Sequence, residues 1–120
     1  KKKYYENKKK IRDFFLDRTD KKIFIFGAGH LTNTFVHLNS ISQFIDFIID
    51  DNIKKRGMFF PNTKIKIISV NDYKKIRGDK ICLIGANPSN ENKIIKKLNV
   101  ENCKFYSIFL NSKRYILKYD

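Results

Sequence analysis

The stretch KKIFIFGAGHLTNTF, residues 21–35, combines residue types that can bind a phosphate group. A short apolar run ends at Gly27-Ala28-Gly29, and a helical pattern follows directly. Gly27 would let the chain leave a strand sharply, and Gly29 would let a phosphate approach backbone N–H groups at a helix N-terminus, where the helix dipole favours an anion. Thr32 stands where the third glycine of a dinucleotide-binding turn is expected. The stretch therefore predicts either a phosphate site or the fold without its cofactor.

Two carboxylates bear on the same question. Asp50 and Asp51 end a second apolar run, close to where a dinucleotide-binding fold places the acid that binds the ribose. Against that reading, Thr32 replaces the glycine that allows close packing of helix on strand. The chain is also too short for a second mononucleotide-binding half. We therefore predict that NAD produces no saturable binding.

Other side chains with chemical potential are few. His30, at the expected helix start, could hydrogen-bond a ligand phosphate or hydroxyl, or could simply lie on the surface or cap the helix. His37 is seven residues further, which is not the spacing of a metal-binding pair. Cys82 and Cys103 have apolar neighbours and are expected to be small buried hydrophobic residues. We predict no catalytic residue and no metal site.

Two loops are expected at the carboxyl edge of the sheet, where open parallel sheets bind ligands. In the loop 52–66, Lys55 and Arg56 could hold a phosphate, and one of the adjacent Phe59 and Phe60 could cover a base or sugar. The alternative is a solvated loop pinned by two buried phenylalanines. After the next long strand, Asn87 could offer a side-chain amide at the same edge.

Apolar periodicity alternates between strand and helix along the whole chain, which predicts a parallel sheet covered on both faces. We expect an α/β fold: a small Rossmann-like three-layer domain with a mostly parallel sheet of four to five strands. Residues 1–20 would form a linker helix and residues 21–120 the domain. The predicted helices are 3–18, 30–42, 70–76 (capped by Ser69) and 89–98 (capped by Ser89). The predicted strands are 21–26, 43–51, 79–86 and 104–110, with a short extended piece at 65–69.

The formal charge of +14 allows nucleic-acid binding as a function, but no nucleic-acid motif accompanies it. The lysines are spread over expected loops and polar helix faces, apart from the lysine-rich first ten residues. Eleven Phe and six Tyr indicate a packed core. No apolar run approaches the roughly 20 residues of a membrane span. We expect a soluble cytoplasmic protein, and, because the chain starts at Lys1, a piece of a longer one.

Three segments, FGAGHLTNTF, IDFIIDDNIKKRGMFFPNTKIKI and CLIGANPSNENKII, together resemble the C-terminal domain of bacterial sugar C-methyltransferases. The resemblance covers about residues 8–109, and the N-terminal helix resembles the family's linker helix. The positions that match the family pattern are Gly27, Asn33, Thr34, Asp50, Lys55, Gly57, Pro61 and Asn87. The positions that depart from it are Leu31, Thr32, Asn62, Lys66 and Ala86.

The resemblance implies a division of labour within a larger enzyme. S-adenosylmethionine and the catalytic residues would belong to a separate methyltransferase domain, which is the expected partner. This domain would help to close the cleft for a nucleotide-sugar substrate, without binding a cofactor or catalysing methyl transfer by itself. The expected ligand-binding residues are Gly27, Gly29, His30, Asn33, Thr34, Asp50, Lys55, Arg56 and Asn87.

Two other functions stay open at this point. One is an independent nucleotide- or sugar-binding Rossmann module, such as the N-terminal domain of a sugar acyltransferase, whose strand, turn and helix can look similar. The other is a basic protein associated with nucleic acid, for which strong salt dependence of binding would be the signature.

Overall fold

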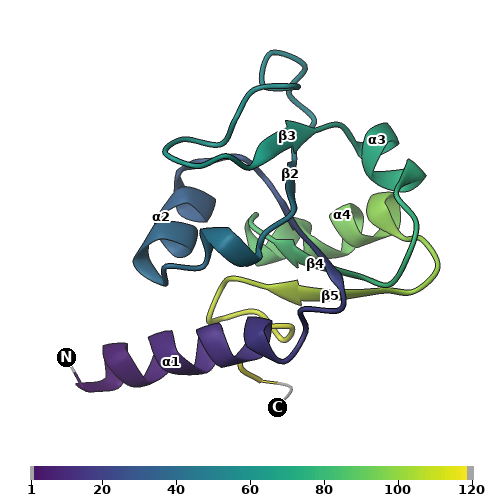
Figure 1. Ribbon diagram of the computed structural model, residues 1–120. Helices are drawn as coiled ribbons and strands as arrows, with labels where there is room; N and C mark the ends of the chain where they lie inside the picture. The colour runs from purple at the N-terminus through teal and green to yellow at the C-terminus, as the bar shows by residue number, and fades with distance from the viewer. Residues whose placement is uncertain (1, 119–120) are drawn as a thin grey trace.

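The computed structural model describes residues 2–118, with side chains from residue 7 onward. Strands and helices alternate along the chain, as the periodicity predicts (Figure 1). The elements are α1 (Lys2–Leu16), β1 (Lys22–Phe26), α2 (His30–Leu38), the 3-10 turn η1 (Ser42–Phe44), β2 (Phe47–Ile49), β3 (Lys66–Ile68), α3 (Val70–Lys75), β4 (Lys80–Ile84), the 3-10 turn η2 (Pro88–Asn90), α4 (Glu91–Leu98) and β5 (Cys103–Ser107).

The five strands form one parallel sheet in the order β3-β2-β1-β4-β5, which confirms the predicted Rossmann-like fold. Phe26, the last residue of β1, lies opposite Ile49 on one neighbouring strand and Ile84 on the other. The carboxyl ends of the three central strands are therefore level. The chain proceeds outward from β1 in one direction to β2 and β3, and in the other to β4 and β5. The boundary between β1 and β4 is thus the switch point of the fold.

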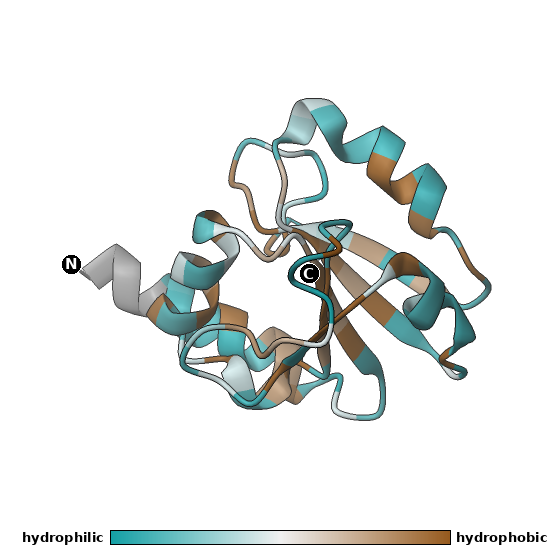
Figure 2. Ribbon diagram, turned by 90° about the horizontal axis from the view of Figure 1, so that it is seen from above, coloured by the Kyte–Doolittle hydropathy of each residue, from teal (hydrophilic) through white to brown (hydrophobic). Residues whose placement is uncertain are grey.

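Alternate residues of the strands supply two separate hydrophobic cores, so the fold has three layers. Ile25, Ile48 and Leu83 lie in the core that faces α1, α2 and the segment after β5. Phe24 and Cys82 lie in the core that faces α3 and α4. Figures 1 and 2 show the two pairs of helices on opposite faces of the sheet, with the apolar strands between them. Because both faces are covered, the strands are nearly continuously apolar in sequence.

Helix α1 packs on the domain through its second half. Ile11, Phe14 and Phe15 are almost completely buried. The Phe14 ring meets Tyr106 of β5 edge to face, with 5.0 Å between ring centroids. Tyr4 and Tyr5 lie outside the described side chains. The predicted division at residue 20 stays a prediction, but the helix contributes to the same core as the sheet.

Two predicted elements, the helix 30–42 and the strand 43–51, are too long. Helix α2 ends at Leu38 because the Asn39 side chain bonds back to the carbonyl of Phe35 at 2.9 Å and Ser40 takes a positive φ of 54°. The apolar run that follows forms a 3-10 turn before a strand of only three residues. Asp46 separates the two, and its carboxylate accepts the N–H of Ile23 at 2.8 Å.

The remaining predicted elements are largely confirmed. The Ser69 hydroxyl accepts the N–H of Asp72 at 3.1 Å and caps α3, as predicted. The predicted cap by Ser89 is wrong. Pro88 starts a 3-10 turn instead, and the Asn87 side chain accepts the N–H of Ser89 at 2.9 Å. A proline favours such a start because its fixed φ suits a first helical turn. The extended piece around residues 66–68 joins the sheet as its edge strand.

After β5 the chain folds back on itself, in a segment that we call the tail (residues 108–118). Ile116 is fully buried and its N–H donates to the carbonyl of Ser107 at 3.0 Å. The N–H of Ser107 in turn donates to the carbonyl of Arg114 at 2.8 Å. The tail, as far as Lys118, is therefore packed as part of the domain.

Candidate functional site

The first and fourth strands end beside each other in two glycine turns, Gly27-Ala28-Gly29 and Gly85-Ala86-Asn87, which form the switch point. Gly27 has a φ of +104°, and a Cβ at this residue would lie 3.0 Å from the carbonyl oxygen of Gly85. Its N–H donates to the carbonyl of Ile49 at 2.7 Å. The first turn is therefore fixed by contacts with both neighbouring strands, and glycine is required there for conformation and for space.

Two of the predicted site residues hold this turn in place, and we call them the Ala28 clamp. Asp50 accepts the N–H of Ala28 on Oδ2 and the N–H of Asn52 on Oδ1, both at 2.7 Å. The ammonium group of Lys55 donates to the carbonyl of Ala28 at 3.0 Å. Both backbone groups of Ala28 are thus bound by side chains of the loop that follows β2. The structure brings Gly27, Asp50 and Lys55 together, as the sequence predicts.

Thr32 and Gly85 meet where the helix packs against the sheet. Thr32 is completely buried, and a Cβ added to Gly85 would lie only 2.1 Å from its Oγ1 atom. A dinucleotide-binding turn achieves close packing with a glycine on the helix. In this chain the glycine is Gly85, which follows β4, and the larger residue, Thr32, is on the helix. Among the described residues, the Thr32 hydroxyl is the buried side-chain group without a hydrogen-bond partner.

Helix α2 begins with open donor groups. Gly29 is its N-cap, and no side chain caps the helix. Within the described part of the chain, no acceptor binds the backbone N–H groups of Gly29, His30 and Leu31. A Cβ at Gly29 would meet no protein atom within 4 Å, so the chain is not crowded at this N-cap. Such an N-terminus suits an anion.

The other predicted residues of α2 differ in exposure. His30 and Thr34 are exposed, whereas Asn33 is half-buried with its backbone N–H bound to the carbonyl of Gly29 at 3.0 Å. The Asn33 side-chain amide has no hydrogen-bond partner among the described residues. His30 and Asn33 are therefore able to bind a ligand, while Thr34 lies on the solvent side.

The long loop is ordered, and its two phenylalanines differ. Phe60 is 1% exposed and stacks on the ring of His37, whose Nε2 lies 3.0 Å from the carbonyl oxygen of Pro61. Phe59 is 60% exposed. The expectation of two buried phenylalanines is wrong for Phe59, because only Phe60 faces α2. Phe59 is free to contact another molecule.

Charged residues near the clamp pair with neighbouring helices. Arg56 lies 3.4 Å from the carboxylate of Asp72 on α3. Asp51 forms an ion pair with Lys97 of α4. These pairs flank a small depression of about 230 Å³ over the ends of β2 and β3. Arg56 is thus engaged away from the glycine turn, whereas sequence reasoning placed it with Lys55 on a phosphate.

Asn87 follows β4 at the switch point and is exposed. Its side-chain oxygen is used in the turn, as described above, which leaves the amide N–H groups free to donate to a ligand. The Asn87 amide therefore lies at the predicted edge of the sheet. Its NH2 group can bind a ligand, whereas its oxygen is engaged in the turn.

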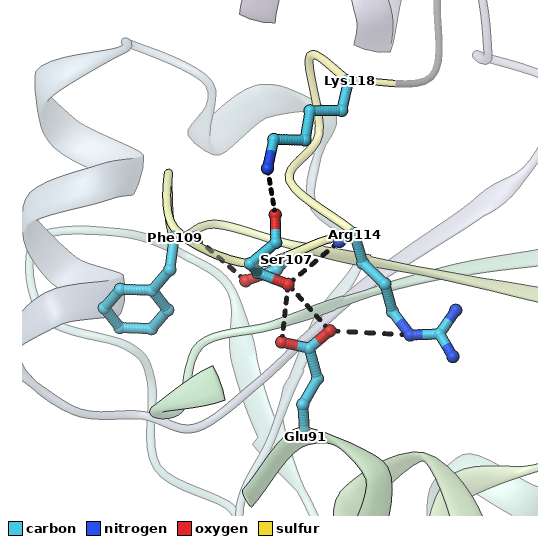
Figure 3. Close-up of polar contacts among 6 residues, drawn as sticks. Glu91, Ser107, Phe109, Arg114 and Lys118 are labelled. Carbon is cyan, nitrogen blue, oxygen red and sulfur yellow. Dashed lines mark hydrogen bonds and ion pairs between the residues drawn. The ribbon is translucent and has the colours of Figure 1, made fainter. Parts of the chain in front are cut away.

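Sequence reasoning missed a polar cluster at the far end of the same edge, which we call the tail latch (Glu91, Ser112 and Arg114). The Ser112 hydroxyl lies 2.9 and 2.8 Å from the two carboxylate oxygens of Glu91, and Arg114 Nε lies 3.5 Å from one of them. Figure 3 shows Glu91 rising from α4 toward the tail, with Arg114 beside it. The local sequence pattern predicts only that Glu91 lies at a helix start, and no sequence signal pairs it with Ser112, 21 residues later.

Cysteine chemistry is disfavoured. Burial raises the pKa of the Cys103 thiol, which accepts a hydrogen bond from the Tyr73 hydroxyl at 3.3 Å. Burial raises the pKa of the fully buried Cys82 still more clearly. Neither thiol is activated as a nucleophile. Over residues 2–118, no group of three His, Cys, Asp or Glu side chains could hold a metal ion, and no helix is both long and apolar enough to cross a membrane.

The chain matches the family model described as "C-methyltransferase C-terminal domain" over residues 1–105. The match covers α1, the sheet and the switch point, and it ends within β5. No curated protein matches the chain.

Proposed function

The chain belongs to the C-methyltransferase C-terminal domain family, and we propose that it forms one wall of a nucleotide-sugar site in a sugar C-methyltransferase. In this proposal the domain binds and orients the substrate, and another domain of the parent protein transfers the methyl group. The observation that carries the proposal is the open N-terminus of α2 at the switch point.

The diphosphate of a nucleotide sugar suits this N-terminus. The N–H groups of Gly29, His30 and Leu31 have no acceptor, and an anion at a helix N-terminus gains about 0.3–1 kcal/mol from the dipole alone. The ammonium group of Lys55, held at the carbonyl of Ala28, adds positive charge beside the turn. Because the Ala28 clamp already fixes the turn, binding would need little rearrangement of the backbone.

Two other groups support binding of the rest of the substrate. Phe59 offers an exposed ring on an ordered loop, which is suitable for covering a base or a sugar face. The loop is held by backbone bonds on either side of Phe59, from Gly57 to Ile67 at 2.9 Å and from Phe60 to Ile65 at 2.7 Å. Asn87 adds amide donors on the other side of the switch point.

The residues present do not fit NAD at this position. The acid that would bind the ribose is Asp50, and each of its two oxygens already accepts a backbone N–H. Asp50 is thus already engaged in holding the glycine turn, which leaves only its remaining acceptor positions for a pair of ribose hydroxyls. The proposal that NAD does not bind therefore rests mainly on Thr32, and this engagement of Asp50 adds to it.

The N-terminus of α2 does not favour the sulfonium end of S-adenosylmethionine either. The sulfonium carries a positive charge, which the helix N-terminus and Lys55 would both oppose. We therefore propose that S-adenosylmethionine, the methyl donor, binds to another domain of the parent protein. In this proposal, the domain holds the acceptor substrate and excludes water from the wall of the cleft that it forms.

Calorimetric titration with uridine diphosphate and thymidine diphosphate tests the proposal. We expect saturable binding, weakened about tenfold by Gly29→Val, because a branched side chain at the N-cap should hinder the approach of an anion to the open N–H groups, while its Cβ meets no protein atom within 4 Å. Tenfold corresponds to about 1.4 kcal/mol. The control is Leu38→Ala, an exposed change at the other end of α2, which should leave affinity unchanged. Absence of binding, or equal binding by the Gly29 variant, would contradict the proposal.

A further inference from the structure

The tail latch lines a pocket that has no role in the proposed nucleotide site. The pocket has a volume of about 420 Å³, which is within the range of roughly 300–1,000 Å³ for small-molecule sites. It lies where α4 begins and the tail passes over it. Its lining residues are Pro88, Glu91, Asn92, Asn111, Ser112, Lys113 and Arg114.

The carboxylate at this pocket is fixed but not saturated. Glu91 is only 5% exposed. The Ser112 hydroxyl has one proton, so it can donate fully to only one of the two oxygens, and Arg114 Nε is 3.5 Å from Oε1. A carboxylate offers about four acceptor positions. Glu91 therefore keeps acceptor capacity in a largely dehydrated place, where hydroxyl donors of a ligand would be bound strongly.

The orientation of these groups does not depend on a ligand. Ser112 Oγ also accepts the N–H of Arg114 at 3.0 Å, and Lys118 donates to the carbonyl of Ser112 at 3.0 Å (Figure 3). The serine is 3% exposed. The tail is thus held in one position over Glu91, and the pocket is formed in advance.

The charges of the lining select against ions of either sign. A bound anion would lie against the Glu91 carboxylate, and a bound cation would lie against Lys113 and Arg114. The pocket has no aromatic residue in its lining, so it offers no platform for a base. Asn92 and Asn111 provide exposed amides that both donate and accept. This set of groups matches a neutral molecule with several hydroxyls.

We propose that this pocket binds the hydroxyl groups of a sugar ring, with Glu91 as the principal acceptor. Asn111 to Arg114 belong to the tail, beyond the residues 1–105 that match the family. The pocket is therefore made partly by a segment outside the family match, and it would give this chain a sugar preference of its own. The inference goes beyond the proposed function, because it does not require a diphosphate at α2.

Amide NMR on the full chain tests the inference, with free sugars (D-glucose, D-galactose, D-mannose and L-rhamnose) in one arm and uridine diphosphate or UDP-glucose in two others. We expect at least one sugar-containing probe to shift the amides of Asn92 and residues 111–114, and uridine diphosphate alone not to shift them. Shifts with UDP-glucose only would identify a nucleotide-linked sugar as the source. Shifts only at α2 would support the nucleotide site and overturn the sugar pocket.

Variants distinguish sugar binding by Glu91 from its role in holding the tail. Glu91→Gln should weaken the sugar-dependent shifts about tenfold, whereas the matched control Glu101→Gln, at an exposed position outside the pocket, should not. If Glu91→Gln loosens the tail, Asn111→Ala gives a second test, because that exposed side chain has no partner in the latch. Unchanged sugar shifts in both pocket variants, or no tail shifts with any sugar, would overturn the proposal.

Discussion

The two ends of the carboxyl edge are held in different ways. In the Ala28 clamp, side chains bind the backbone of a turn, so Asp50 and Lys55 fix the shape of the chain itself. In the tail latch, side chains bind one another, so Glu91, Ser112 and Arg114 fix the position of a separate segment. The clamp should therefore govern the geometry of the nucleotide site, and the latch should govern only the tail and its pocket.

The contact between Thr32 and Gly85 joins the two halves, and its loss should have the largest effect. Gly85→Ala would place a Cβ 2.1 Å from Thr32 Oγ1 and 2.9 Å from the Phe26 carbonyl oxygen. We expect a loss of about 3 kcal/mol in the free energy of unfolding, measured by urea denaturation. Adding Thr32→Ala should recover part of it, because the side-chain clash is then removed.

The control is Gly29→Ala, where the new Cβ meets no atom within 4 Å. This change should cost no more than about 1 kcal/mol, the difference between glycine and alanine at an N-cap. Equal losses for the two glycine variants would show that the close packing at Gly85 is not what joins helix and sheet.

Removal of the clamp should have the next largest effect. Asp50→Ala leaves the N–H groups of Ala28 and Asn52 without their acceptor, and we expect a loss of about 2 kcal/mol. Hydrogen exchange at the Ala28 amide should accelerate. The adjacent Asp51→Ala removes only an exposed ion pair with Lys97 and should cost less than about 1 kcal/mol. A reversed order would mean that the turn is held by something other than Asp50.

The latch should show a smaller and more local effect. Glu91→Ala leaves the Ser112 hydroxyl and Arg114 without their carboxylate, but it also removes a buried charge, so we expect a net loss of about 1 kcal/mol. Hydrogen exchange should quicken at Ile116 while Ala28 stays protected. Faster exchange at both amides would contradict the independence of latch and clamp.

Cys103, in the core on the face of the sheet that packs against α3 and α4, should have the smallest effect, on the pH dependence of stability. Burial raises the pKa of Cys103 above its ordinary value of 9.0, so the folded state favours the neutral thiol. This contribution is complete below that value and is lost as the pH rises through the higher folded pKa. Thermal denaturation between pH 8 and 10 should therefore show a slightly smaller loss for Cys103→Ala than for the native chain. An equal or greater loss in the variant would refute this assignment.

The sheet and the position of Asp50 beside the glycine turn could be predicted because their signals are local, whereas the hydrogen bonds of Asp50 and Lys55 to Ala28 were not predicted. An apolar run, a glycine turn, a helix and a second run ending in a carboxylate specify a strand-turn-helix-strand unit, and Asp50 then lies beside the turn by topology alone. The same reasoning did not predict the ion pair of Arg56 with Asp72, because that contact depends on where α3 packs. The same reasoning also predicted a second strand longer than β2, because nothing in the sequence indicates that Asp46 accepts the N–H of Ile23.

The latch and the Thr32 contact could not be predicted for a common physical reason. Each depends on two segments that the sequence gives no reason to pair. Thr32 is interpretable as a lost glycine until Gly85 is placed next to it, and Glu91 is an ordinary helix-start residue until the tail returns over it. Such contacts come from the tertiary fold, which periodicity does not encode.

The most direct test of the account is amide NMR of the native chain titrated with uridine diphosphate. We predict that the largest shifts occur at Gly29, His30, Leu31 and Asn87, the donors around the switch point, and that they saturate. Shifts confined to other parts of the chain, or no saturable shift at these four amides with either uridine or thymidine diphosphate, would contradict the claim that the carboxyl edge of this domain binds a nucleotide sugar.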